Sequence, residues 1–423
     1  MGIETRISRT SRGVPIGLRD VSEKAIAQQQ WRPEAGDTGL PVLTLDRAAY
    51  LSNCDAMFAY TAAVGAMIAP HAKTPMSPAL AEDLLARGAW GLTVADARQA
   101  LVLLEAGFRK LVLANQIGGV RSGRRFGRML AEFPDAEAVL FVDSVDSLAA
   151  VNAAGEAAER PLDILVEVGG ARAGARTIEN ISGIISAAVD AQFVRLRGVA
   201  AYEGASAVAD AEETRRAIAD LHALTSDAFA LVRQAEPQRQ LIVSSGGSSF
   251  FDLVVADLSG LVRSDGNSFL LLRSGAIFFH DHGVYRRSLA ELDRRGGFEP
   301  AGLGPASSTF RPALRAWAEV LSRPTATLAI CGMGMRDVSF DQGFPVALSA
   351  WRDGRKIASA ESTVLKLNDQ HAFLAIDGDD ELKVGDIVEF GISHPCTCMD
   401  RWRWIFELGD DGTVHRLLPT FFG

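Results

Sequence analysis

The sequence predicts an α/β protein in which a (β/α)8 barrel of the TIM type is followed by a C-terminal, mostly antiparallel β domain. From Pro41 onward, short β-type runs alternate with amphipathic helical stretches, as expected for βα units around a parallel sheet. These units repeat every 20 to 45 residues or so, which favours a closed barrel over an open doubly wound sheet, the alternative. After about residue 290, short strands are separated by Asp-Gly, Asn-Asp and Gly-Asp turn signals.

The chain before the barrel, residues 1–38, is polar, rich in arginine and without sustained periodicity except for a short helix around Val21–Gln30. We expect an N-terminal arm that is pinned to the body of the molecule or to a partner subunit. The barrel is expected over residues 39–290 and the β domain over 291–423, with Gly296–Ser308 as the linker.

The barrel region contains nine strand candidates for an eight-stranded closure. The candidates are Val42–Asp46, Met67–His71, Trp90–Val94, Lys110–Ala114, Ala138–Val142, Ile164–Val168, Gly198–Tyr202, Leu241–Ser244 and Phe269–Arg273. Several of the helices between them begin after a Ser or Thr cap. The predicted helices are Ser77–Arg87, Ala95–Ala106, Val145–Ala158, Thr177–Ala191 and Asp210–Gln234.

The β domain is predicted from short strand-type runs bounded by turn residues. These runs are Thr327–Ile330, Val346–Trp351, Thr363–Leu367, Ala372–Ile376, Ile387–Ile392 and Trp402–Leu408.

Composition excludes several classes of function. Forty-three Lys and Arg residues against 52 Asp and Glu give a net charge of −9, so no global cationic field attracts nucleic acid or a membrane surface. No run reaches about 18 uninterrupted apolar residues, and the first residues do not resemble a signal peptide. Four cysteines are too few for a disulfide scaffold in a chain of 423 residues. We therefore expect a soluble, cytoplasmic protein.

The first candidate for chemistry is Lys73, in the segment Pro70–Thr74 after an apolar strand. The chain has six lysines, and Lys73 alone stands just past a barrel strand in this way. Barrel enzymes place reacting groups after the C-terminal ends of their strands. An amine partly desolvated there would be a nucleophile able to form a Schiff base. A lysine that merely extends into solvent is the alternative, and it is favoured when Lys73 is considered alone.

The second candidate is the segment Ser244–Ser249, whose sequence is Ser-Ser-Gly-Gly-Ser-Ser, after a late barrel strand. Paired glycines let backbone N–H groups converge, and hydroxyl groups add donors, so the segment suits a phosphate. A plain glycine-rich turn would not require four serines, and we favour phosphate binding. By contrast, Gly119–Arg124 lacks the Gly-Lys-Ser/Thr element of a nucleotide loop.

Two further strand ends carry polar groups. Arg172 lies on a glycine-rich loop after Ile164–Val168, where it could bond an oxyanion or the phenolate of a ring cofactor, or could be a surface arginine. Tyr202 and Glu203 place a phenol and a carboxylate at another strand end, although Tyr202 could equally be a core aromatic residue.

The β domain contains the segment Ser393–Asp400, in which His394 and Cys396 are two positions apart. On an extended segment this spacing puts both side chains on one face, where they could bind a borderline-soft cation such as zinc. Two protein ligands leave positions for water or substrate, as a catalytic metal requires. A buried cysteine near a solvated histidine is the common alternative to so short a motif.

Together these segments resemble the fold-type III family of pyridoxal-phosphate enzymes, within the branch of D-serine dehydratases, D-threonine aldolases and D-amino-acid deaminases that share an alanine racemase-like barrel. The resemblance spans about residues 40–423. It rests on the order and spacing of Pro70–Thr74, Arg172-x-Gly174, Ala201–Tyr202, Ser245–Ser248, Leu272–Gly275 and His394–Thr397.

The resemblance implies a role for each candidate. Lys73 would carry pyridoxal 5'-phosphate as a Schiff base, and Ser245, Gly246, Gly247 and Ser248 would hold its phosphate. Arg172 would lie near the phenolic oxygen, Tyr202 near the ring nitrogen, and His394 with Cys396 would bind a divalent metal, expected to be zinc. The resemblance also implies that Val42–Asp46 joins the β domain while Phe269–Arg273 closes the barrel. A homodimer is expected, with each active site between one barrel and the partner's β domain.

Two departures from the family pattern bear on the reaction. Relatives continue after the lysine and threonine with a His-Lys pair, whereas this chain has Pro75-Met76. Aldolases tend to have histidine after the tyrosine, whereas this chain has Glu203, which is either a replacement base or a supporting carboxylate. We therefore predict a lyase that dehydrates or deaminates a D-β-hydroxy amino acid, such as D-serine or D-threonine, to a keto acid and ammonia. A D-threonine aldolase, an amino-acid racemase and a cofactor-carrying regulatory protein are the alternatives.

Overall fold

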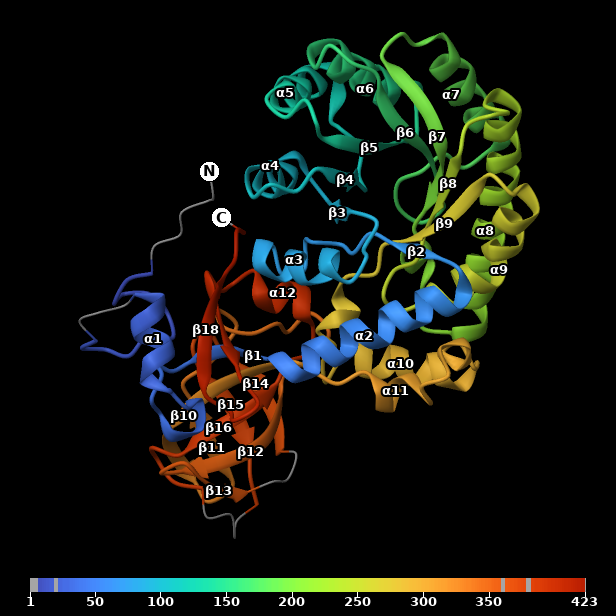
Figure 1. Cartoon of the computed structure of the whole chain (residues 1–423). Helices are drawn as coiled ribbons and strands as arrows, with labels where there is room; N and C mark the ends of the chain where they lie inside the picture. The colour runs from blue at the N-terminus through green and yellow to red at the C-terminus, as the bar shows by residue number, and fades with distance from the viewer. Residues whose placement is uncertain (1–6, 19–21, 359–361, 378–381, 423) are drawn as a thin grey trace.

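The computed structural model describes residues 7–18, 22–358, 362–377 and 382–422. Its first large unit is an eight-stranded parallel sheet in the order β2-β9-β8-β7-β6-β5-β4-β3. The sheet closes on itself, because a parallel bridge joins His71 to Thr93 and the Trp90 N–H donates to Ile68 O at 2.8 Å. The predicted barrel is therefore confirmed and the open sheet is excluded (Figure 1). The strands are β2 (Met67–Ile68), β3 (Leu92–Val94), β4 (Lys110–Leu113), β5 (Glu137–Val142), β6 (Leu162–Val168), β7 (Val194–Ala201), β8 (Leu241–Ser244) and β9 (Ser268–Leu272).

Helices surround this barrel on its outside (Figure 1). Several begin at a residue whose side chain accepts a hydrogen bond from a backbone N–H of the first turn, namely Asp46, Asp96, Ser144, Thr177 and Asp210. The helices are α2 (Arg47–Val64), α3 (Pro78–Ala86), α4 (Ala97–Glu105), α5 (Gly119–Ala131), α6 (Val145–Ala157), α7 (Ile178–Asp190), α8 (Ala211–Ala235), α9 (Phe251–Asp265), α10 (Val284–Arg294) and α11 (Ala306–Thr309).

The inside of the barrel is filled by apolar side chains from different strands. Val112, Phe141, Leu165, Ile242 and Leu271 belong to one buried cluster there. The strands are buried on both faces, which is why they read as nearly continuous apolar runs in the sequence. The barrel is therefore a packed support, and its polar loops lie at one end.

The second unit is an antiparallel sheet with one parallel pairing. β1 (Val42–Asp46) lies in this sheet, antiparallel to β10 and parallel to β17. The remaining strands are β10 (Leu314–Thr325), β11 (Leu328–Cys331), β12 (Val346–Arg352), β13 (Arg355–Ala358), β14 (Ser362–Leu367), β15 (Ala372–Ala375), β16 (Ile387–Gly391), β17 (Trp404–Leu408) and β18 (Val414–Pro419).

The longest strand, β10, is absent from the prediction, as are β13 and β18. β10 pairs with β1, β11 and β16 and occupies the middle of the sheet. Pro312 and Pro324 bracket its sequence and suggest a loop, but Pro312 precedes the strand and Pro324 lies where its register shifts. Tertiary pairing therefore decides this element against its local signals.

The N-terminal segment packs on the second sheet. Its helix α1 spans Glu23–Gln29, and the predicted start at Val21 lies outside the described residues. Val14, Ile26 and Trp31 are buried in a cluster with Trp317 and other residues of the sheet. This segment is therefore bound to the body of its own chain.

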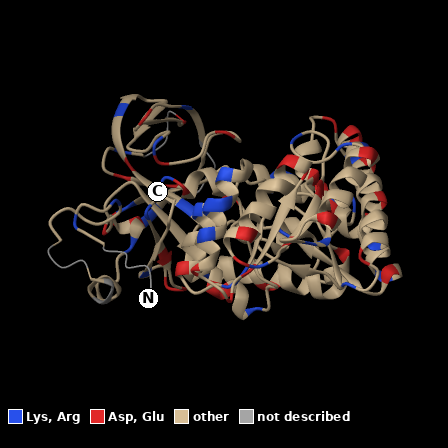
Figure 2. Ribbon diagram, turned by 90° about the horizontal axis from the view of Figure 1, so that it is seen from above, with Lys and Arg blue, Asp and Glu red and all other residues tan. Residues whose placement is uncertain are grey.

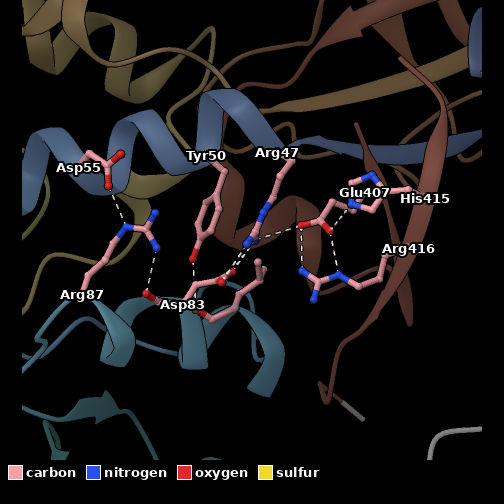
Figure 3. A network of polar contacts seen from close by, with 9 residues as sticks. Arg47, Tyr50, Asp55, Asp83, Arg87, Glu407, His415 and Arg416 are labelled. Carbon is pink, nitrogen blue, oxygen red and sulfur yellow. Dashed lines mark hydrogen bonds and ion pairs between the residues drawn. The ribbon is translucent and has the colours of Figure 1, made fainter. Parts of the chain in front are cut away.

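A polar network joins the two units (Figure 3). Arg47, at the start of α2, forms ion pairs with Asp83 of α3 and with Glu407 of β17, the latter at 3.2 Å. The Glu407 carboxylate is buried and also accepts hydrogen bonds from Arg416 at 2.8 and 3.0 Å and lies 3.0 Å from His415 Nε2. Because each carboxylate oxygen is bonded, the network holds β17 and β18 firmly against α2 and α3.

Acidic and basic residues are interspersed over the outer helices of the barrel (Figure 2). Among the described residues, no helix combines the length and the hydropathy needed to cross a membrane.

Candidate active site

A cavity of about 560 Å³ lies where the C-terminal ends of the barrel strands meet the second sheet. Loops after β2, β3, β4, β6, β7, β8 and β9 contribute to its wall, and so does α12 (Pro395–Met399) of the second unit. The barrel and the β domain of one chain thus line the same cavity. The expected position of the partner's β domain at the active site of a homodimer stays a prediction.

Lys73 lies in this cavity and is exposed to it. Its backbone N–H donates to His71 Nδ1 at 3.4 Å, and burial together with the positive charges of Lys73 and Arg273 holds the pKa of His71 well below its usual value. His71 is therefore neutral beside the amine at physiological pH. The Lys73 amine is exposed to the cavity. The side chains around it therefore do not provide the partial removal from solvent that the sequence predicts.

The Ser-Gly-Gly-Ser segment after β8 is organised around Glu203. The Glu203 carboxylate is fully buried and accepts hydrogen bonds from Ser245 Oγ at 2.8 Å, Gly246 N at 3.1 Å and Gly247 N at 2.5 Å. Gly246 has φ +100°, a conformation that favours glycine. Ser245 and Glu203 do not line the cavity, whereas Gly246, Gly247 and Ser248 do. This position favours the supporting carboxylate over the replacement base as the role of Glu203.

The donors free to bind a phosphate are therefore different from those expected. Among the described residues, no partner is found for the backbone N–H groups of Ser248, Gly275 and Ala276, which all line the cavity. The Ser248 hydroxyl and the buried end of Tyr285 lie beside them. A group with several acceptor oxygens, such as a phosphate, fits this arrangement because every oxygen would meet a donor.

Arg273, at the end of β9, lies at the bottom of the cavity and is only 6% exposed. Its guanidinium donates to Ser244 Oγ at 2.5 Å and Ala201 O at 2.7 Å, and it lies 5.1 Å from the Phe141 ring centroid. No carboxylate of the described residues is within ion-pair distance of it. A buried cation without an ion pair is costly unless a ligand compensates it, so Arg273 is suited to an electron-rich group of a cofactor. In the sequence, the segment Leu272–Gly275 supports only the family resemblance and does not by itself predict that Arg273 binds a cofactor.

Arg172 and Tyr202 line the cavity from the loops after β6 and β7. The Arg172 guanidinium lies 4.8 Å from the Tyr202 ring centroid, and its Nη2 is 3.8 Å from Glu167, whose carboxylate is also bonded by Gln116. Both Arg172 and Tyr202 line the cavity, as the sequence predicts. Arg172, Lys73 and Arg273 give the cavity three cationic side chains in a protein whose net charge is −9.

His394 and Cys396 line the cavity together, but the local structure differs from the prediction. The segment is the start of helix α12 and not an extended strand, because Pro395 occupies the first helical position, where its fixed φ favours a helix start. The Thr74 hydroxyl lies 3.2 Å from Cys396 Sγ, which places the pair beside the segment of Lys73. An imidazole and a thiol are zinc donors.

The His394 ring is held by two polar neighbours. Asp341 Oδ2 lies 2.6 Å from His394 Nδ1, and Thr397 Oγ1 donates to Asp341 Oδ1 at 2.6 Å. Burial lowers the pKa of His394, but contacts with Cys396 and Asp341 outweigh it and raise the pKa to about 9. A carboxylate on Nδ1 leaves Nε2 as the atom free to ligate a cation. In the described parts of the chain, no group of three or more His, Cys, Asp or Glu side chains could hold a metal, so other ligands would be water or substrate.

The cluster after β9 lies behind the cavity. His280 and Asp281 are buried and do not line the cavity, whereas Tyr285 does. Asp281 Oδ1 accepts hydrogen bonds from Gly283 N at 2.7 Å and Tyr285 N at 2.9 Å, and so caps α10. Its role is to position the helix that carries Tyr285.

Comparison with known proteins places these features in a family. Residues 45–263 match the family described as "Alanine racemase, N-terminal domain", and residues 313–408 match the family described as "Putative serine dehydratase domain".

Two characterised relatives and a solved structure are similar over most of the chain. A D-threonine aldolase of Arthrobacter sp is 25% identical over 359 residues, covering 84% of this chain and 85% of the relative. A 3-hydroxy-D-aspartate aldolase of Paracoccus denitrificans is 27% identical over 361 residues, covering 84% of each. The metal-free form of a D-threo-3-hydroxyaspartate dehydratase variant has a TM-score of 0.70 at 22% identity, covering 91% of this chain and 98% of that one. These matches confirm the family resemblance and the fold inferred from the sequence.

Proposed function

The chain belongs to the alanine racemase N-terminal domain family, and from this premise we propose that it is a pyridoxal-phosphate- and metal-dependent lyase acting on D-β-hydroxy amino acids. The reaction proposed is dehydration and deamination of a substrate such as D-serine or D-threonine to a 2-keto acid and ammonia. D-amino-acid lyases are the relatives to which it is similar along most of its length.

One observation carries this proposal: a single cavity brings together an accessible lysine amine, three backbone N–H groups with no partner among the described residues, two arginine guanidinium groups and a His–Cys pair. The amine suits an aldehyde, the N–H groups suit a phosphate, and the buried guanidinium of Arg273 suits an electron-rich ring atom. Pyridoxal 5'-phosphate carries all three groups, and when bound it supplies an electron sink for a bond broken at the substrate Cα.

Each residue of the cavity would have a separate role around that cofactor. Lys73 would hold the aldehyde carbon, and its amine is the base available for the Cα proton. Ser248, Gly275 and Ala276 would bind the phosphate, while Glu203 keeps the adjacent Gly246–Gly247 turn in shape. Arg172 would orient the ring from the side of Tyr202.

His394 and Cys396 would bind a divalent cation, for which zinc is the best match to an imidazole and a thiol. A cation there would polarise the substrate β-hydroxyl, so that hydroxide becomes a better leaving group. One related dehydratase variant is described as metal-free, which fits a metal in that enzyme. The four cysteines are all free, which suits a reducing cytoplasm, and by the family resemblance we expect a homodimer.

The second candidate is retro-aldol cleavage to glycine and an aldehyde, which is favoured by the aldolases among the relatives. Cleavage requires a base at the β-hydroxyl. Glu203 does not reach the cavity, so no carboxylate from that strand end is placed to take this proton. Because the residue in the place of the aldolase histidine, Glu203, supplies no base to the cavity, we favour dehydration.

The test is a product assay with a panel of D- and L-β-hydroxy amino acids, with and without a chelator. We expect pyruvate and ammonia from D-serine, and loss of both after chelation. Glycine and acetaldehyde from D-threonine would establish the aldolase instead. Absence of keto acid and of aldehyde from every substrate would reject the proposal.

A further inference from the structure

The segment Thr420–Phe422 follows β18 and reaches the cavity, where Phe422 is a half-buried lining residue. Two hydrogen bonds fix the residue before it. The Phe421 N–H donates to Met76 O at 2.9 Å, and Arg98 Nη1 donates to Phe421 O at 2.7 Å. Both partners belong to the barrel, so the segment is attached to the rim of the barrel after β2 and β3.

The start of the segment is fixed beside the His–Cys pair. The Thr420 N–H donates to Arg403 O at 2.9 Å, and its hydroxyl donates to Trp402 O. These two acceptors follow closely after α12, which carries Cys396. The network of Figure 3 holds β18 against α2 and α3, so the segment leaves β18 from a fixed position.

The strand order places Phe422 across the barrel from Ser248, whereas the other two proposed donors, Gly275 and Ala276, follow β9. In the closed order, β3 and β4 lie across the barrel from β7 and β8. Arg98, which binds Phe421, is in the first turn of α4, directly after β3. The cavity residues Ala95, Gln99 and Asn115 lie on this same side, across from Gly246–Ser248.

This side of the cavity is where a substrate side chain would lie. A cation on His394 and Cys396 would take the β-hydroxyl, so the other substituent of the β-carbon would face the neighbouring wall. Within the described parts of the chain, that wall contains the Phe422 ring and uncharged residues, and no lysine or arginine side chain lines it. Asp400 also lines the cavity beside α12. The apolar ring of Phe422 and the carboxylate of Asp400 disfavour a second carboxylate on the substrate. The Phe422 ring also limits the size of the substituent on the substrate β-carbon.

We propose that Phe422 is a specificity-determining residue, which admits a hydrogen or methyl on the substrate β-carbon and disfavours a carboxylate or an aromatic ring. Arg98 is the positioning residue that holds it, through Phe421. This inference rests on the proposed function, whose relatives include an enzyme named for 3-hydroxy-D-aspartate; this chain would prefer D-serine or D-threonine to that substrate.

The test uses Phe422→Ala and Phe422→Arg in the holoenzyme, with two readouts. The first is kcat/KM for D-serine, D-threonine, β-phenyl-D-serine and 3-hydroxy-D-aspartate. The second is the dissociation constant of the unreactive analogues D-alanine, D-phenylalanine and D-aspartate, measured from the absorbance change of the bound cofactor. Leu303→Ala removes an exposed apolar side chain outside the cavity and is the matched control.

In Phe422→Ala we expect the preference for D-alanine over D-phenylalanine to fall by roughly tenfold or more, because space for one ring is opened. In Phe422→Arg we expect a similar gain for D-aspartate, and in Arg98→Ala a smaller shift toward D-phenylalanine. Unchanged ratios in both Phe422 variants of an active protein would overturn the inference. A wild-type protein that neither turns over nor binds any of these compounds would instead reject the proposed function.

Discussion

Replacing Glu203 tests directly whether this residue supports the Gly246–Gly247 turn or acts as a catalytic base. Its carboxylate accepts three hydrogen bonds, from Ser245 Oγ and from the N–H groups of Gly246 and Gly247, and it is fully buried. In Glu203→Gln, one oxygen can still accept from two of these donors. The new amide nitrogen then faces the third donor. Because an amide nitrogen is itself a donor, it cannot accept that hydrogen bond.

The magnitude follows from this geometry. The variant loses one charge-assisted hydrogen bond and leaves one buried N–H without an acceptor, which together cost about 2–4 kcal/mol. Such a loss lowers the thermal unfolding midpoint by roughly 2–5 °C in a protein of this size. The turn beside the phosphate donors would also be distorted, so pyridoxal phosphate should lose affinity while pyridoxal, which has no phosphate, should lose less.

The assay is thermal unfolding of the cofactor-free protein together with the ratio of the dissociation constants of pyridoxal and pyridoxal phosphate. Glu212→Gln is the control, since that carboxylate is exposed and pairs with Arg215 three residues later, and its midpoint should not change. If Glu203→Gln keeps the wild-type midpoint and affinity ratio but loses turnover, Glu203 is a catalytic base and the present assignment is refuted.

Three further changes test other parts of the site. Burial, opposed by hydrogen bonds from Gly283 and Tyr285, raises the pKa of Asp281 to about 7, so the folded protein binds an extra proton and its stability falls by about 4 kcal/mol as pH rises from about 4 to 7. Asp281→Asn should remove this pH dependence. A difference from wild type in thermal unfolding that is independent of pH would contradict this prediction. Arg273→Lys cannot satisfy Ser244 and Ala201 as a planar fork does, and should weaken pyridoxal phosphate binding at least tenfold by equilibrium dialysis, whereas unchanged binding would exclude a cofactor role. Asp341→Asn should weaken zinc binding roughly 10- to 100-fold in a chelator competition while cofactor content stays constant, and equal zinc affinity would show that Asp341 does not orient His394.

The barrel could be predicted from sequence because its strands are buried on both faces and therefore give apolar runs with regular spacing. Lys73, Arg172, Tyr202 and Ser248 were placed at strand ends by that spacing alone, and the structure brings all four to one cavity. Local signals failed where pairing decides the conformation, as in β10, and where one residue changes it, as Pro395 does by starting α12.

The donors proposed for the phosphate could not be predicted in the same way. Gly246 and Gly247 have the composition of an anion-binding turn, but a buried carboxylate more than forty positions earlier already occupies their N–H groups. Nothing in the local sequence reveals that contact, since Glu203 is separated from the turn by helix α8 and strand β8. The burial of Arg273 could not be predicted for a related reason, because it depends on neighbours from other strands; an arginine directly after an apolar strand was the available signal.

The most direct test of the account is the covalent state of Lys73. Purified protein supplied with pyridoxal 5'-phosphate should be coloured, and reduction with borohydride should add the mass of the reduced cofactor to the peptide that contains Lys73 and to no other. Lys73→Ala should show neither change. A colourless protein, or a reduced sample in which the Lys73 peptide keeps its original mass, would contradict the account.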